Sequence, residues 1–167
     1  GHIIYAKAQI LSPGGQKTEV LTFGPLSVLP HCQKQGIGGA LLRHSIQEAA
    51  RLGYRAVVIY GHPDYYPRFG FRPALAFHLT SPDGSSPDTL MALELYAGAL
   101  NGVRGKFYES SVYEVKPEEV AEFDKGFPPK EPARLLPIEA LTDQLPAPAR
   151  EAFLHHNLRY VGTLLRF

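Results

Sequence analysis

Three glycines within four consecutive positions mark the part of this sequence whose residue types most directly indicate chemistry. They lie in the segment Gln33-Lys34-Gln35-Gly36-Ile37-Gly38-Gly39, between an apolar run and an amphipathic stretch. Glycine has no side chain, so the backbone at these positions can approach a ligand closely. The free N–H groups at the start of a helix point to the same place and favour an anion. The segment therefore predicts a site for a phosphate or another anion.

Two common phosphate-binding motifs do not fit this segment. A dinucleotide fingerprint needs a third glycine where this chain has Leu41, and a P-loop ends in Gly-Lys-Ser or Gly-Lys-Thr. The structural alternative is a glycine-rich corner between a strand and a helix, without a ligand. The gathering of glycines at a helix start favours binding over this alternative.

A hairpin is expected before the glycine segment. Residues 3–11 and 19–28 are rich in β-branched and apolar side chains, and a turn-forming segment separates them, as in an antiparallel hairpin. Gly24-Pro25 interrupts the second run. Because proline cannot donate a hydrogen bond to a neighbouring strand, we expect a bulge or a sheet edge there.

A helix is expected after the glycine segment. Leu42, Ile46 and Ala49 recur at helical spacing within residues 37–52. Residues 54–60 follow as an apolar run without alternation, which is typical of a strand buried on both faces. Strand, helix and strand then form a βαβ unit. This unit places the glycine segment at the carboxyl end of its first strand, where α/β sheets bind ligands.

The patterns in the rest of the chain are weaker. Three further strands are expected, at residues 76–80, 90–96 and 105–115. After Val115 prolines become frequent, and an apolar stripe predicts a second amphipathic helix over residues 148–165.

Composition limits the partners and the location. The 167 residues carry 17 Lys and Arg against 16 Asp and Glu, and this net charge of +1 indicates neither nucleic acid nor a membrane as a partner. The single cysteine, Cys32, excludes an intrachain disulfide and fits a reducing compartment, so we expect a cytoplasmic protein. No apolar run is long enough to cross a bilayer, and the first residues lack the pattern of a signal peptide.

Two motifs in the chain resemble signatures of the GNAT family of N-acetyltransferases. The stretch from Leu26 to Leu42 resembles the acetyl-CoA-binding motif of that family, Val-x-Pro-x-x-(Gln/Arg)-x-x-Gly-Ile-Gly-x-x-Leu. The stretch from Tyr65 to Phe71 resembles the second signature, Tyr-x-(Lys/Arg)-x-Gly-Phe. The separation of the two, one helix and one strand, also matches. The form of the second motif is similar to that of a bacterial branch of predicted acetyltransferases.

The resemblance implies an α/β fold of the acyl-CoA N-acyltransferase type, with a mixed sheet and flanking helices. It covers about residues 1–130 and implies an acetyl-CoA-binding domain at residues 1–127. A proline-rich arm and a helix would follow at residues 128–167 and pack on this domain or on a partner subunit. The family's usual first strand and two helices have no counterpart before residue 3. These elements are expected to be lost, supplied by a partner or replaced by the C-terminal helix.

The resemblance also implies roles for particular residues. Backbone groups of Leu26, Ser27 and Val28 would hold the pantetheine arm and the acetyl carbonyl. Tyr66 would be the general acid toward the leaving thiolate, with Tyr65 as the fallback, since a phenol stays protonated at neutral pH. The pyrophosphate would be held by the backbone of the glycine turn, with added charge from its lysine: Gln33, Lys34, Gln35, Gly36, Ile37, Gly38 and Gly39.

Each of these roles has a structural alternative. The alternative for Tyr66 is a role in packing alone, and the alternative for Lys34 is an ordinary solvated charge. The general base is not identified by the sequence, because each candidate carboxylate is also compatible with a surface position. These candidates are Glu19, Glu94 and Glu109.

The resemblance therefore predicts an N-acetyltransferase that moves an acetyl group from acetyl-CoA to an amine by direct attack in a ternary complex, without a metal. The acceptor would be a small-molecule or peptide amine, and a homodimer would be one way to cover an exposed sheet face. The alternative is an acyl-CoA-binding or sensing module with little or no transferase activity.

Overall fold

The computed structural model describes residues 1–128 of the chain. The contacts divide the chain into two units, of which the first is Gly1–Lys116 and the second begins at Pro117. The helix α2 (Pro117–Asp124) belongs to the second unit. The predicted helix over residues 148–165, and all but the first residue of the predicted arm, lie outside the described residues.

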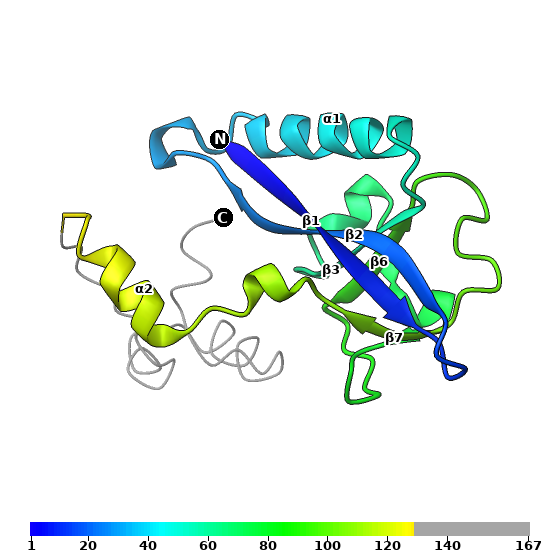
Figure 1. The fold of residues 1–167 in the computed structure, drawn as a ribbon. Helices are drawn as coiled ribbons and strands as arrows, with labels where there is room; N and C mark the ends of the chain where they lie inside the picture. Colours follow the sequence, from blue (N-terminus) through cyan, green and yellow to red (C-terminus); the bar gives the residue numbers. More distant parts are fainter. Residues whose placement is uncertain (129–167) are drawn as a thin grey trace, which may run out of the picture. The chain divides into compact units, whose positions relative to one another are not determined.

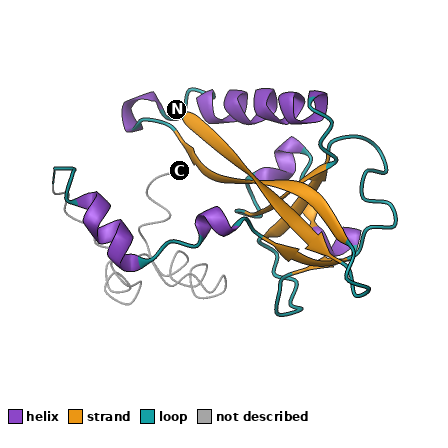
Figure 2. Cartoon of the chain, in the orientation of Figure 1, coloured by secondary structure: helices purple, strands orange, loops and turns teal. Residues whose placement is uncertain are grey.

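One sheet organises the first unit, and its seven strands lie in the order β4-β6-β3-β2-β1-β7-β5. β1 and β2 form an antiparallel hairpin, whereas β2 and β3 run parallel. This mixed α/β sheet confirms the predicted fold class. Figures 1 and 2 show the long hairpin crossing the sheet, with α1 along one side of it. The elements of the first unit are β1 (His2–Leu11), β2 (Lys17–Ser27), α1 (Ile37–Arg51), β3 (Ala56–Tyr60), β4 (Arg72–Pro73), β5 (Leu79–Thr80), β6 (Leu90–Glu94), β7 (Gly105–Tyr108) and the short 3-10 helices η1 (Pro30–Cys32), η2 (Tyr66–Phe69), η3 (Ala74–Phe77) and η4 (Ser111–Tyr113).

The βαβ unit formed by β2, α1 and β3 is confirmed. Gly53 follows α1 with a φ of 83°. Helices commonly end with a residue in this left-handed conformation, which glycine adopts without steric strain. Four of the five residues of β3 are buried, as its uniformly apolar run predicts. The glycine segment follows the carboxyl end of β2 and leads into α1.

The hairpin also contains the predicted bulge. Its register shifts between the pairs Tyr5↔Phe23 and Ile3↔Leu26, so that Gly24-Pro25 lies opposite a single residue of β1. Such a bulge locally disrupts the hydrogen bonds between two strands and bends the bulged strand.

Side chains from the two faces of the sheet form separate cores. The α1-side core contains Leu21, Ala49, Val57, Ile59, Phe71 and Met91, with partly buried neighbours that include Phe23 and Tyr66. The β7-side core contains Ala8, Ile10, Val20, Ala56, Val58, Ala74, Phe77, Leu79, Leu90, Ala92, Leu100 and Phe107. Successive strand residues point to opposite faces, which is why Val20 and Leu21 lie in different cores.

Two predicted strands are wrong in part. The strand predicted at residues 76–80 is the helix η3 followed by the two-residue strand β5, because His78 turns the chain with a φ of 58°. The strand predicted at residues 105–115 ends at Tyr108. The chain then enters η4, whose first turn is capped by the hydroxyl of Ser110.

Candidate functional site

The glycine segment forms a turn around an uncapped helix start. Gly36 is the N-cap of α1 with a φ of 80°, no side chain caps this end, and the first turn contains no acidic residue. The Ala40 N–H donates to the Gly36 carbonyl at 2.9 Å, so the N–H groups from Gly36 to Gly39 have no acceptor within the helix. Lys34 is also left-handed, with a φ of 61°. Such residues gather neighbouring N–H groups into a concave surface suited to an anion.

The glutamine side chains stabilise this turn. Gln33 Nε2 donates to the Val28 carbonyl at 3.0 Å, and Gln35 Nε2 donates to the His31 carbonyl at 3.3 Å. The Gln33 N–H is also engaged, since it donates to the Pro30 carbonyl at 3.3 Å. The open donors of the predicted set are therefore in its glycine-rich part.

The two sequence motifs meet in space at the start of α1. A Cβ atom at Gly38 would lie 3.7 Å from the Tyr65 hydroxyl oxygen. A Cβ atom at Gly39 would lie 3.5 Å from Cζ of Phe69. η2 therefore packs beside the glycine turn, although the two are separated in the sequence by α1 and β3.

The strands β2 and β3 part beside this turn. Their only backbone pair is Leu21↔Val57, although β2 continues to Ser27. On its other edge β2 stays paired with β1 through Leu26↔Ile3. The end of β2 therefore has one satisfied edge and one edge that faces the opening between the strands.

Aromatic side chains line this opening on the α1 side. The Tyr66 ring lies 5.7 Å from Phe23, 5.6 Å from Phe71 and 5.1 Å from Tyr65. Burial raises the pKa of Tyr66 above its ordinary value, and nearby Tyr65 and Tyr5 raise it further. Tyr66 therefore remains protonated well above neutral pH, as a proton donor must.

Two arginines beside the turn were missed by the sequence analysis. Arg43 Nη2 would lie 3.4 Å from a Cβ atom at Gly39, and its guanidinium lies 5.7 Å from the Phe69 ring centre. Arg68 stacks on the Tyr65 ring at 4.5 Å and donates to the Tyr65 carbonyl at 2.9 Å. The position of Arg43 could have been predicted from the sequence, because residues four apart, such as Gly39 and Arg43, lie on one face of a helix.

Two of the three candidate bases lie away from the glycine turn. Glu19 is near the opposite end of β2 from Ser27, about 26 Å along a strand that rises about 3.3 Å per residue. It forms an exposed ion pair with Lys7 at 3.1 Å. Glu94 ends β6 opposite the first residue of β3, and its carboxylate accepts the Leu100 N–H at 2.8 Å. Only Glu109 follows a strand, β7, that runs toward the glycine-turn end of the sheet.

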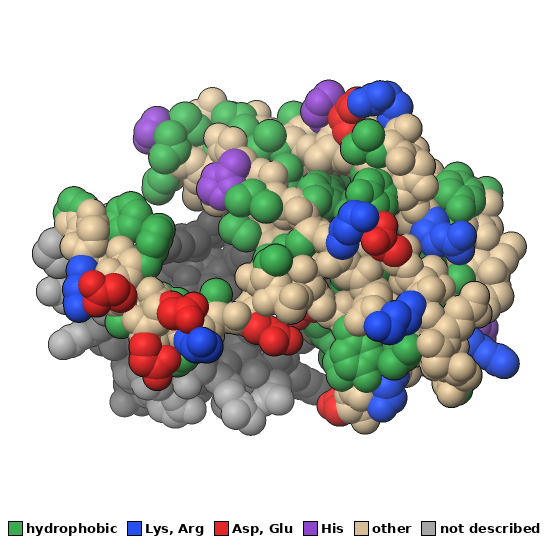
Figure 3. Space-filling model, viewed as in Figure 1, with side chains coloured by type: hydrophobic (Ala, Val, Ile, Leu, Met, Phe, Trp, Pro, Cys, Tyr) green, Lys and Arg blue, Asp and Glu red, His purple; other side chains and the backbone are tan. Residues whose placement is uncertain are grey.

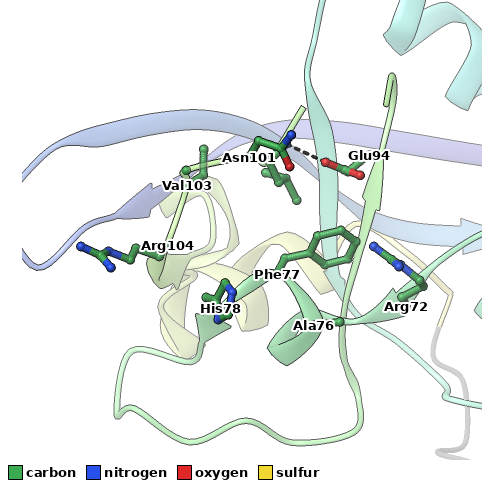
Figure 4. A pocket seen from close by; sticks show the side chains of 10 residues that line it. Arg72, Ala76, Phe77, His78, Glu94, Asn101, Val103 and Arg104 are labelled. Atoms are coloured by element: carbon green, nitrogen blue, oxygen red, sulfur yellow. Dashed lines mark hydrogen bonds between the residues drawn. The ribbon is translucent and has the colours of Figure 1, made fainter. Parts of the chain in front are cut away.

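A cavity in the first unit lies away from the glycine turn, since none of its lining residues belongs to that turn. It measures about 570 Å³, and Figure 4 shows Arg72 and Glu94 at one end of it, Arg104 at the other, and Phe77 between them. Charged side chains on the face of the first unit in Figure 3 are dispersed, with basic and acidic groups in contact at some points. The open donors at the start of α1 are backbone N–H groups, and the cationic side chain of Arg43 lies beside them.

Residues 1–128 contain no group of three or more His, Cys, Asp or Glu side chains placed to hold a metal ion. None of the helices in this part of the chain has the length and apolar character that crossing a membrane requires. Cys32 is a free, partly buried thiol.

Comparison with known proteins agrees with this geometry. Residues 2–73 match the family model of the acetyltransferase (GNAT) domain. The match spans the hairpin, the glycine turn, α1 and η2. Residues 2–73 are therefore similar to the GNAT acetyltransferase domain. This match confirms the resemblance that the two sequence motifs indicated.

Two curated proteins with similar sequences are named as N-acetyltransferases. Uncharacterized N-acetyltransferase YjhQ of Escherichia coli K12 is 36% identical over 74 residues, which are 44% of this chain and 40% of that protein. Uncharacterized N-acetyltransferase YhbS of the same strain is 31% identical over 91 residues, 54% of each protein. The chain thus spans about half the length of these relatives, or less.

Two solved structures have the same fold. The crystal structure of YhbS from Escherichia coli in complex with CoA matches with a TM-score of 0.59 and 26% identity, covering 68% of this chain and 61% of that one. A GNAT family acetyltransferase from Brucella melitensis in complex with acetyl-CoA matches with a TM-score of 0.50 and 27% identity, over 67% of this chain and 59% of the other.

Proposed function

We propose that this chain is a GNAT-type enzyme that transfers an acetyl group from acetyl-CoA to an amine. The observation that carries the proposal is the uncapped start of α1 beside the end of β2, where β2 and β3 part. A pyrophosphate bound at the N–H groups of Gly36 to Gly39 would be stabilised by hydrogen bonds and by the helix dipole. The CoA and acetyl-CoA complexes of the two structural neighbours support this choice of donor.

The end of β2 would hold the thioester. Successive strand residues direct their backbone groups to opposite edges, so the segment Leu26, Ser27 and Val28 presents groups to the opening as well as to β1. An N–H group aimed at the acetyl carbonyl would stabilise the negative charge that develops on its oxygen during attack.

Tyr66 would supply the proton in the second half of the reaction. The amine nitrogen bonds to the acetyl carbon, the carbon–sulfur bond breaks, and the Tyr66 hydroxyl gives its proton to the thiolate sulfur. The surplus proton of the new amide passes to solvent, and the phenolate is reprotonated. The attack is direct, in a ternary complex, and Arg43 and Lys34 add positive charge near the phosphates.

The test is a binding and turnover experiment on the purified chain. Acetyl-CoA should raise the melting temperature, and CoA should be released in the presence of propylamine, spermidine, lysine methyl ester or a short lysine peptide. An unchanged melting temperature at millimolar acetyl-CoA would contradict donor binding. Binding without CoA release from any of these amines would instead favour an acyl-CoA-binding or sensing module.

A further inference from the structure

An arginine and a glutamate face one cavity at the end of the strands away from the glycine turn. Glu94 is the last residue of β6 and lies opposite Ala56, the first residue of β3. The glycine turn follows the carboxyl end of β2, which runs parallel to β3. The cavity of about 570 Å³ that Arg72 and Glu94 line together is therefore separate from the proposed acetyl-CoA site (Figure 4).

The strand pairing directs both side chains to the same face of the sheet. Arg72 of β4 lies opposite Ala92 of β6, and Glu94 is two residues farther along β6. Opposite residues share a face, and so do residues two apart on one strand. Since Ala92 belongs to the β7-side core, Arg72 and Glu94 both point to that side. Diagonal neighbours of this kind lie about 7–8 Å apart, within reach of long side chains.

The two opposite charges are nevertheless held by different neighbours. The Arg72 guanidinium lies over the Phe77 ring at 4.4 Å, and Glu94 Oε1 accepts the Leu100 N–H at 2.8 Å. Within residues 1–128, neither Arg72 nor Glu94 takes part in an ion pair. The guanidinium donors and the second oxygen of the carboxylate are therefore available to a ligand that carries both charges.

The wall beside this charged pair is apolar. Phe77 is 8% exposed and Leu100 is 4% exposed, and both side chains line the cavity with Ala76 and Val103. Figure 4 shows the Phe77 ring between the end with Arg72 and the end with Arg104. A cavity of this size with an apolar wall and a few polar groups is typical of a small-molecule site.

The walls are held in place by hydrogen bonds between distant parts of the chain. Arg55 Nη1 donates to the Ala99 carbonyl at 3.3 Å, next to Leu100. The Gly105 N–H donates to the His78 carbonyl at 3.1 Å, which ties the end of η3 to the start of β7. The cavity is therefore formed before any ligand arrives, and binding would need little reorganisation of the walls.

We propose that this cavity binds a free α-amino acid with an apolar side chain, its carboxylate held by Arg72 and its ammonium group by Glu94. A guanidinium offers a carboxylate two parallel hydrogen bonds, and the free oxygen of Glu94 accepts one from the ammonium group. The side chain of the amino acid would lie on Phe77 and Leu100, where it leaves water.

The inference goes beyond the proposed function and does not depend on it. An ammonium group has no lone pair with which to attack a thioester, and this one would lie at the far end of the strands from the glycine turn. The amino acid is therefore a second ligand of the chain and not the acceptor of the acetyl group.

The first experiment measures the affinity of the full chain for leucine and its analogues by calorimetry, without acetyl-CoA. Isocaproate lacks the amino group of leucine, and isoamylamine lacks the carboxylate. Each should bind at least about tenfold more weakly than leucine, because each loses one charge-assisted contact. Glycine should also bind more weakly, since it has no side chain to cover Phe77 and Leu100.

Two variants assign the contacts. Arg72→Gln should raise the Kd for leucine at least about tenfold and leave that for isoamylamine unchanged. Glu94→Gln keeps an oxygen for the Leu100 N–H and should weaken leucine and isoamylamine, but not isocaproate. Arg104→Gln is the matched control, because it removes the same charge from the other end of the same cavity. Thermal unfolding checks that each variant is folded.

A second measurement locates the ligand. In the isotope-labelled chain, leucine should shift the amide signal of Leu100, whose N–H donates to Glu94, and leave the signals of Gly38 and Gly39 in place. Acetyl-CoA should act in the opposite way. Leucine that shifted the glycine signals and left that of Leu100 unchanged would be bound at the transferase site, and the inference would be wrong.

The remaining outcomes separate this inference from the proposed function. No binding of leucine at millimolar concentration overturns the inference, and so does equal affinity for leucine and both analogues. A loss of affinity in Arg104→Gln as large as that in Arg72→Gln also overturns the assignment. None of these results bears on acetyl transfer, and a chain that transferred no acetyl group could still bind leucine in this cavity.

Discussion

Buried tyrosine hydroxyls surround the end of β2, and their burial makes the stability of the fold depend on alkaline pH. Burial raises the pKa of Tyr5, against a hydrogen bond with Ser45, and burial also raises the pKa of Tyr66. Above the ordinary value of 10.0 the unfolded chain loses these protons first, so the folded state binds more protons. Their contribution to stability is complete below that pH and is lost as the pH rises through the folded values.

The first prediction concerns Tyr5. The Tyr5→Phe variant removes the 3.0 Å hydrogen bond to Ser45 and should cost about 1 kcal/mol at neutral pH. It should also flatten the decline of stability between about pH 9 and about pH 11, because one raised phenol pKa is gone. Urea unfolding across this range is the measurement, with Tyr96→Phe as control. An equal alkaline slope in the variant would show that Tyr5 does not contribute to it.

The second prediction concerns Tyr66. The Tyr66→Phe variant keeps the ring contacts with Phe23 and Phe71 and removes the proposed proton donor. We expect kcat for CoA release to fall about a hundredfold, with the Kd for acetyl-CoA within about twofold. Since the pKa of Tyr66 is raised, its ionisation should not lower the rate of the unsubstituted chain at neutral or mildly alkaline pH. If kcat fell by this amount in Tyr65→Phe and stayed unchanged in Tyr66→Phe, the proton donor would be Tyr65.

At the scale of elements, the start of α1 carries the third prediction. A Cβ atom at Gly38 would have its nearest neighbours at 3.7 Å, so the Cβ of Gly38→Asp meets only ordinary contacts. The carboxylate should interact favourably with the helix start, by about 0.5 kcal/mol, while it repels a pyrophosphate at the same N–H groups. We therefore expect equal or higher thermal stability together with a Kd for acetyl-CoA raised at least about tenfold.

The neutral variant Gly38→Ala is the control for this charge effect, since it adds a Cβ atom without a carboxylate. It should bind acetyl-CoA more tightly than Gly38→Asp does. If both variants bind equally, the helix start is not an anion site.

The bulge in β2 carries the fourth prediction. In Gly24→Ala the new methyl group collides with the Tyr113 ring, which should destabilise the fold by about 1–3 kcal/mol. Removing the ring in the double variant Gly24→Ala with Tyr113→Ala should recover part of this loss, and a double-mutant cycle by urea unfolding measures the coupling. Additive effects of the two substitutions would contradict the contact between η4 and the bulge.

The elements that were predicted correctly are those whose signal is local. The hairpin, the bulge at Gly24-Pro25 and the helix over residues 37–52 follow from propensities and spacing within a few residues of each other. The contact of Tyr113 with Gly24 has no such signal, because it depends on how far β7 extends and where η4 turns. Residues 105–115 have enough apolar side chains for a long strand, and only the cap at Ser110 ends it.

The candidate site was predicted in the same uneven way. The glycine turn was found because backbone geometry at a helix start is encoded by neighbouring residues. The general base was not found in this way. Glu19 and Glu94 lie on predicted strands, and the direction and order of those strands decide at which end of the sheet each carboxylate lies. That order is a tertiary property, and it places both carboxylates far from the turn.

At the scale of the first unit, the sheet separates two cores that have different consequences for function. The α1-side core includes Phe71, which contacts Tyr66 at 5.6 Å and Phe23 at 6.3 Å beside the opening between β2 and β3. The β7-side core includes Phe107, which is fully buried and belongs to β7 near the other edge of the sheet. Loss of packing in either core should therefore lower stability to a similar extent. Only loss of packing in the α1-side core should also affect the proposed reaction.

The last prediction compares Phe71→Leu with Phe107→Leu. Both side chains are at most 2% exposed, so each substitution should lower the free energy of unfolding by about 1–2 kcal/mol and leave the chain folded. Phe71→Leu should also lower kcat for CoA release, because the Tyr66 ring loses a wall that holds its hydroxyl in place. Phe107→Leu should retain kcat when both variants are assayed well below their unfolding transitions. Equal losses of kcat would mean that the two faces of the sheet act on the site as one rigid body, and a normal kcat in Phe71→Leu would remove the positioning role of the aromatic cluster around Tyr66.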